Sequence, residues 1–134
     1  MFRVCIHVII LTLGLASPSR ADDAIRMAVS YFDNNTGQAS FEPLRKGMAD
    51  MMISDLAVSK VLTLVEREKL EDLLKEINLA KGAYVDPKTA AKMGEGLGAE
   101  MIITGAFTKV DDVLRIDSRV IMVDSSQVMT TASV

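Results

Sequence analysis

The sequence has 134 residues, 49% of them hydrophobic and 25% charged, with 15 basic side chains against 18 acidic ones. This acidic balance excludes the basic face through which proteins bind nucleic acid phosphates. The only cysteine and the only histidine are Cys5 and His7, near the N-terminus. If that segment is removed, the rest of the chain has no means for triad catalysis, thiol redox chemistry or a zinc site of cysteine and histidine.

The first 21 residues have the pattern of a secretory signal peptide. Arg3 precedes an apolar run from Val4 to Ala16, and small residues stand at Ser19 and Ala21. The apolar run is shorter than the roughly 20 residues of a membrane-spanning helix. We therefore predict cleavage after Ala21 and a periplasmic mature chain, residues 22–134, that has no membrane span. Removal of the two basic residues in the signal leaves a formal charge of −5.

A βαβ unit is predicted at the start of the mature chain. Ile25–Phe32 is a strand-like apolar run, and the turn-forming residues Asp33–Gly37 follow it. Between Phe41 and Ser59 an apolar side chain recurs at every fourth position, which predicts an amphipathic helix. Val61–Val65 is nearly all apolar, so we expect a parallel strand that is covered on both faces. The apolar stripe of the helix is Leu44, Met48, Met52 and Leu56, and Met51 beside it is expected to pack in the core.

The second half of the chain predicts two helices and then an antiparallel meander. Glu66–Ile77 has apolar residues at i, i+3, i+4 and i+7, and a shorter helix is bounded by an Asp86-Pro87 start and by Gly98. The predicted strands are Met101–Phe107, Leu114–Met122 and Gln127–Val134. The fold class is therefore α/β, a mixed sheet of about five strands packed with three helices. The expected strand order is second, first, third, fourth, fifth.

Few residues of the mature chain suggest catalysis. The available carboxylate pairs are Asp111 with Asp112 and Asp117 with Asp124, but aspartates in predicted turns are usually turn formers. Gly94–Gly98 follows a helix and precedes a strand, the reverse of the context of a nucleotide-binding loop. We expect no enzyme activity, no metal and no cofactor.

The loop after the first strand is the candidate partner-binding site. Asn34, Asn35, Thr36 and Gly37 lie between a parallel strand and a helix, the position at which open α/β sheets commonly bind ligands. The loop has neither the glycine and lysine pattern of a phosphate loop nor the spacing of a calcium loop. We expect its side chains to be exposed and to contribute little packing energy. They either only build the turn or also contact a protein partner.

Several phrases of the sequence together resemble the curli production assembly/transport component (CsgG) family. They occur in one order along nearly the whole mature chain: Met27–Asn34, Pro43–Met48, Leu64–Leu70, Asp86–Gly105 and Arg115–Arg119. The resemblance implies a periplasmic, protein-binding α/β domain, like the TolB amino-terminal domain and the outer-membrane activators of penicillin-binding proteins. Glu66 and Arg67 match one family phrase, and for these we favour a structural role.

The resemblance implies a non-enzymatic part in cell-envelope assembly or secretion, as a curli-type export accessory. The partner would be an envelope protein or a second copy, with association to the outer membrane through that partner. The alternative is an activator of a penicillin-binding protein, which would regulate peptidoglycan synthesis. Two features depart from the namesake secretion subunits: this signal peptide has no lipid-attachment cysteine, because Cys5 precedes the apolar run, and the chain has no segments for membrane hairpins. We therefore expect that it does not form that pore by itself.

Overall fold

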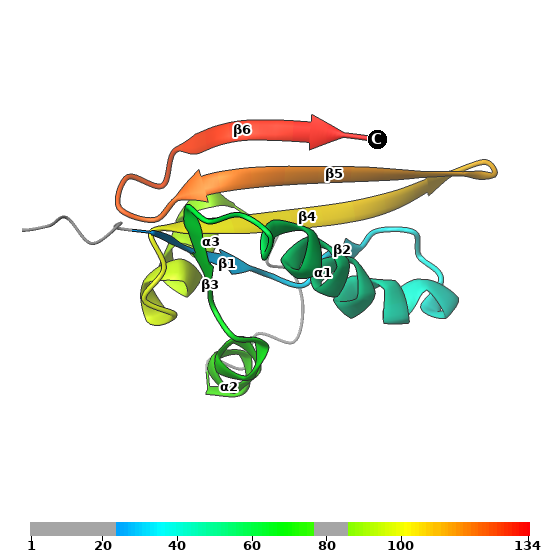
Figure 1. The fold of residues 1–134 in the computed structure, drawn as a ribbon. Coiled ribbons are helices and arrows are strands. Elements are labelled where there is room, and N and C mark those ends of the chain that lie inside the picture. The colour runs from blue at the N-terminus through cyan, green and yellow to red at the C-terminus, as the bar shows by residue number, and fades with distance from the viewer. Residues whose placement is uncertain (1–23, 77–85) are drawn as a thin grey trace, which may run out of the picture.

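The protein is described by a computed structural model that covers residues 24–76 and 86–134. The predicted signal peptide, residues 1–21, and Ile77 of the second predicted helix lie outside the described residues. Within the described part, a six-stranded mixed sheet packs with three α-helices (Figure 1). The elements are β1 (Ile25–Val29), β2 (Asp33–Asn34), the 3-10 helix η1 (Ala39–Phe41), α1 (Glu42–Leu56), β3 (Leu62–Leu64), α2 (Arg67–Glu76), α3 (Pro87–Gly96), β4 (Met101–Val110), β5 (Val113–Met122) and β6 (Val128–Ser133).

The sheet has the order β3-β1-β4-β5-β6, which confirms the strand order predicted from the sequence. β3, β1 and β4 run parallel, and β4, β5 and β6 form an antiparallel meander. The two-residue strand β2, which the sequence did not predict, continues the line of β1 and pairs with β4 at Ala106 and Phe107. β4 and β5 are ten residues each and extend well past the shorter parallel strands (Figure 1).

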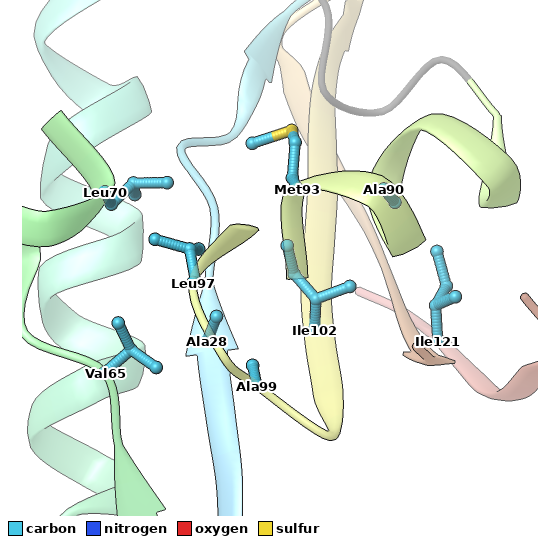
Figure 2. Close-up of a cluster of buried hydrophobic side chains, with 9 residues drawn as sticks. All are labelled: Ala28, Val65, Leu70, Ala90, Met93, Leu97, Ala99, Ile102 and Ile121. Carbon is cyan, nitrogen blue, oxygen red and sulfur yellow. The ribbon is translucent and has the colours of Figure 1, made fainter. Parts of the chain in front are cut away.

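The central strand β1 supplies two cores because successive side chains of a strand point to opposite faces. Met27 and Val29 pack with Ala49 of α1 and with Ile103 on one face. Ala28 points to the other face, where α3 and the start of α2 cover the sheet. Figure 2 shows the side chains of this second cluster directed toward a common interior; they are Ala28, Val65, Leu70, Ala90, Met93, Leu97, Ala99, Ile102 and Ile121. The sheet is therefore the middle layer of three.

The face of α1 that packs on the sheet includes Met52 and Leu56 of the predicted stripe and adds Ala49 and Ile53. Ala49 is its buried residue, with Met52, Ile53 and Leu56 packed around it, whereas Met51 is 69% exposed. The prediction that Met51 packs in the core is therefore wrong. A stripe of every fourth residue rotates by about 40° per step, because a helix has 3.6 residues per turn. Only the part of that stripe that faces the strands packs against the sheet.

The strand β3 is an edge strand, which corrects the expectation that both of its faces are covered. Leu62 and Leu64 pack toward α1 on one face, while Thr63 on the other face is exposed. Val61 is 64% exposed, and Val65, just past the strand, is the buried member of the run. The apolar composition of residues 61–65 could not show that the helices leave one face of β3 exposed.

The third helix has the caps that its sequence predicts. The Asp86 carboxylate accepts hydrogen bonds from the Thr89 backbone N–H at 2.8 Å and from the Thr89 hydroxyl at 2.9 Å. These bonds lower the pKa of Asp86 below its ordinary value, the backbone bond having the larger effect. Gly98, after the helix, has a φ of 65°, a left-handed conformation that glycine adopts without strain. The glycine run 94–98 therefore ends a helix, as predicted.

Candidate partner-binding loop

Asn34 organises the predicted partner-binding loop into a closed turn. Its side-chain oxygen accepts hydrogen bonds from the backbone N–H and the hydroxyl of Thr36, at 3.0 and 2.6 Å. Its amide nitrogen donates to the carbonyl oxygen of Gln38 and to the carboxylate of Glu42, each at 3.0 Å. Asn34 is half-buried, so the expectation of an exposed side chain with little structural role does not hold at this position. Its polar atoms are used by the loop and by Glu42, the first residue of α1.

The remaining residues of the loop form its outer surface. Asn35 and Gly37 are exposed, while Thr36 is half-buried. The Asn35 backbone N–H donates to the Phe107 carbonyl oxygen at 2.9 Å, which fixes the main chain against β4 and leaves the side chain toward solvent. Gly37 has a φ of 73°, which closes the turn. The loop thus presents the Asn35 side chain on a backbone held at both ends.

Arg45 of α1 joins the loop to the helix that follows it. Its Nε donates to the Phe32 carbonyl oxygen at 3.0 Å, and its guanidinium lies 3.7 Å from the Asp33 carboxylate and 3.5 Å from that of Glu42. Arg45 is half-buried and Asp33 is buried, so their contact is less screened by water than a surface ion pair, whereas Glu42 is exposed. The carboxyl end of β1, the loop and the first turn of α1 therefore form one connected unit.

A second polar cluster lies where α1 and α2 meet the end of β1. The Tyr31 hydroxyl donates to the Glu71 carboxylate at 2.7 Å, and the Lys46 ammonium lies 3.0 Å from the same carboxylate. Burial and the bond to Glu71 raise the pKa of Tyr31 to about 12. The Tyr31 and Lys46 hydrogen bonds, that of Tyr31 first, lower the pKa of Glu71. The cluster ties both helices to the sheet.

Arg67 and Glu66, which match a family phrase, have different environments. Arg67 forms an ion pair with Asp50 of α1 and is half-buried. The pair joins α2 to α1, which is the kind of contact that a structural role for Arg67 requires. Glu66 is exposed just before α2. No cluster of three potential metal ligands occurs among residues 24–76 and 86–134.

An enclosed cavity among the described residues is smaller than a small-molecule site. A cavity of about 10 Å³, lined in part by Tyr31, Ala49 and Arg67, lies between α1, α2 and the sheet. That volume is about the size of one water molecule, whereas sites for small molecules measure about 300 to 1,000 Å³. Two wider depressions elsewhere on the described surface are open to solvent.

Asp117 and Asp124 do not have the spacing of a catalytic carboxylate pair. Asp117 lies in the middle of β5, where it accepts hydrogen bonds from Ser133 at 2.6 Å and from Arg115 at 2.9 Å. These two partners, Ser133 first, lower the pKa of Asp117. Asp124 lies beyond the end of the strand, about 16 Å or more away at 3.3 Å per residue, whereas glycosidase carboxylates are about 5 to 9.5 Å apart. Asp111 and Asp112 are exposed in the β4–β5 turn, as turn formers are.

These features define a small three-layer α/β domain with a hydrogen-bonded surface loop. The chain belongs to the curli production assembly/transport component CsgG family, whose model matches residues 12–134. This confirms the resemblance seen in the sequence. No helix among the described residues is long and apolar enough to cross a membrane.

Solved structures of bacterial proteins share the fold at low sequence identity. The LpoB C-terminal domain from Salmonella enterica has a TM-score of 0.66 and 12% identity, covering 87% of this chain and 84% of its own. Lipoprotein GNA1162 from Neisseria meningitidis has a TM-score of 0.63 and 14% identity, covering 81% and 77%. TolB from Acinetobacter baumannii has a TM-score of 0.51 and 16% identity, covering 84% of this chain and 23% of its own. The comparison with curated proteins gave no match.

Proposed function

We propose that this chain acts in the bacterial cell envelope as a non-enzymatic domain for assembly or secretion, working through protein–protein contacts as a curli-type export accessory. The family match over residues 12–134 carries this proposal. The loop at residues 34–37 supports it, because the hydrogen bonds of Asn34 hold a turn that presents the exposed residues Asn35 and Gly37.

The proposed location is the periplasm, with association to the outer membrane through a partner. The predicted signal peptide is the basis for export. The acidic mature chain fits a protein partner rather than nucleic acid.

The second candidate function is activation of a penicillin-binding protein. The fold likeness to the LpoB C-terminal domain, which spans most of both chains, favours this candidate. The two candidates share a compartment and a mode of action and differ in the partner. Partner identity therefore distinguishes them.

The experiment is chemical crosslinking in the periplasm followed by affinity capture and mass spectrometry. Recovery of secreted fibre or adhesin components supports the export role, and recovery of a peptidoglycan synthase supports the alternative. Recovery of neither, with the tagged chain folded and exported, would contradict both.

A pair of matched variants tests the loop. Asn35→Arg places a charge on the exposed loop, and Ser125→Arg places the same charge on the exposed β5–β6 turn at the other end of β5. Neither side chain is buried, so each variant is expected to change stability by less than about 0.5 kcal/mol. We expect Asn35→Arg to reduce partner capture and Ser125→Arg to leave it unchanged. Equal capture by both would remove the loop from the interface.

A further inference from the structure

The strand β6 forms an open edge of the described sheet. All six of its residues, Val128–Ser133, are exposed. It contains no charged residue and no proline, two of the devices with which proteins prevent an edge strand from pairing with another chain, although it has a β-bulge. The opposite edge, β3, is only three residues long. The helices lie over the other half of the sheet and leave the β6 edge open (Figure 1).

The hydrogen bonds between β5 and β6 show which backbone groups point outward. Ile116 and Val134 exchange both of their main-chain bonds, at 2.8 and 3.0 Å. Because bonded and non-bonded pairs alternate in an antiparallel ladder, Ala132 and Thr130 also bond to β5. The backbone N–H and C=O of Thr131 and Ser133 between them must point away from the sheet. They form a regular set of donors and acceptors along the free edge.

A bulge limits the length of this edge. Val120 is opposite Thr130 and Ile121 is opposite Val128, so Met129 is an extra residue on β6. Pairing beyond the bulge would be out of register with the first part of the strand. The edge that keeps one register therefore begins at Thr130 and includes residues 130–134.

We propose that β6 pairs antiparallel with β6 of a second copy of this chain about a two-fold axis at Ala132. In that register, Thr131 of each copy is opposite Ser133 of the other, and each such pair exchanges two main-chain bonds. Ala132 is opposite itself, and its methyl group is small enough for the close approach of a non-bonded pair. The two sheets would join into one continuous sheet.

The strand favours a second copy because its pattern is self-complementary. A two-fold contact uses the same patch on both subunits, so a charged edge would bring like charges together. The uncharged residues 130–134 avoid this repulsion although the whole chain is acidic. The Thr131 and Ser133 hydroxyls would lie opposite each other on one face of the joined sheet, where such pairs stabilise neighbouring strands. This inference does not depend on the proposed function.

The first test is the mass of the exported chain by sedimentation at a series of concentrations, together with amide hydrogen exchange. We expect a reversible dimer and slow exchange of the Thr131 and Ser133 amides only at concentrations at which it forms. The Thr130 and Ala132 amides should be protected in monomer and dimer alike. A monomer at every concentration would overturn the proposal. If the outward amides of that monomer were nevertheless protected from exchange, another strand would cover the edge.

Two sets of variants test the register. Thr131→Pro removes an outward N–H, whereas Thr130→Pro removes an N–H bonded to β5, so only the first should abolish the dimer while the fold remains stable. Ala132→Lys and Ala132→Glu should each weaken the dimer at least about tenfold, because like charges meet at the axis, and a mixture of the two should form a heterodimer. A dimer that persists in Thr131→Pro and Ala132→Lys would refute pairing through this edge.

Discussion

Gly105→Ala is predicted to destabilise the protein because Phe32 occupies the space above Gly105. A Cβ at position 105 would lie 2.1 to 2.7 Å from three atoms of the Phe32 ring, closer than the 3.0 Å below which something must shift. Phe32 is 1% exposed and Gly105 is buried in β4, so neither has room to move away. The Phe32 carbonyl oxygen also accepts the Arg45 hydrogen bond that joins the loop to α1. Movement of Phe32 would disturb the candidate site.

Overpacking of this kind costs about 1 to 3 kcal/mol in the free energy of unfolding, or a fall in Tm of about 4 to 12 °C for a domain of this size. Phe32→Leu removes the two outer ring atoms in the clash. Its expected cost lies between the limit of about 1.5 kcal/mol for a volume-conserving change and the roughly 3 to 5 kcal/mol of Phe→Ala. In the double variant two of the three short contacts are gone, and the smaller leucine side chain relieves much of the clash. The combined loss should therefore be smaller than the sum of the single losses by about 1 kcal/mol or more.

The assay is equilibrium unfolding in urea of the two single variants, the double variant and the parent. Gly47→Ala is the control, because a Cβ at Gly47 in α1 meets no atom within 4 Å. The same substitution there should stabilise the protein by about 0.4 to 1 kcal/mol, since alanine favours the helix. Additivity of Gly105→Ala and Phe32→Leu to within about 0.5 kcal/mol would refute the steric argument.

Three further predictions concern the polar cluster, the metal requirement and export. An ultraviolet absorbance titration should give the Tyr31 phenol a pKa of about 12. Because this pKa is raised on folding, the contribution of Tyr31 to the free energy of unfolding is complete below pH 10 and is lost as the pH rises from 10 to 12. Tyr31→Phe should remove that transition and cost about 0.5 to 1.5 kcal/mol. Chelator should leave the Tm unchanged, and a fall of several degrees would reveal a metal site. Mass spectrometry of the periplasmic protein should find Asp22 as its first residue, and an intact Met1 in the cytoplasm would contradict the signal assignment.

The order of elements could be predicted because each local pattern agreed with the global fold. Periodicity changed from helical to alternating at Met101, and turn residues marked both ends of β5. Periodicity could not show which elements would cover a face. Met51 and Val61 lie in apolar runs with the composition of core segments, yet both side chains are mostly exposed because the neighbouring layer does not cover them. Which face of a helix or strand is buried depends on how the layers pack together, and a short stretch of sequence does not contain that information.

The position of the candidate loop was predictable, but the use of each side chain was not. The turn-forming sequence indicated where the loop lies, since Asn and Gly favour such turns. It could not show that both polar ends of Asn34 are used by Thr36, Gln38 and Glu42, because Glu42 belongs to the next helix. In the same way, Arg67 is paired with Asp50, which is 17 positions away in the sequence. Contacts of this range depend on the packing of α1 against the sheet.

The loop and the free edge lie on opposite sides of β4, and this separation has a functional consequence. β2, which begins the loop, pairs with one side of β4, while β5 and then β6 lie on the other. Pairing of two β6 strands would therefore leave both loops accessible, and a dimer could present two partner-binding surfaces. Two linked sites bind a multivalent partner more tightly without any new contact. Thr131→Pro should then weaken capture of such a partner while leaving the affinity of a single loop unchanged, whereas Asn35→Arg should weaken that affinity and leave the dimer intact.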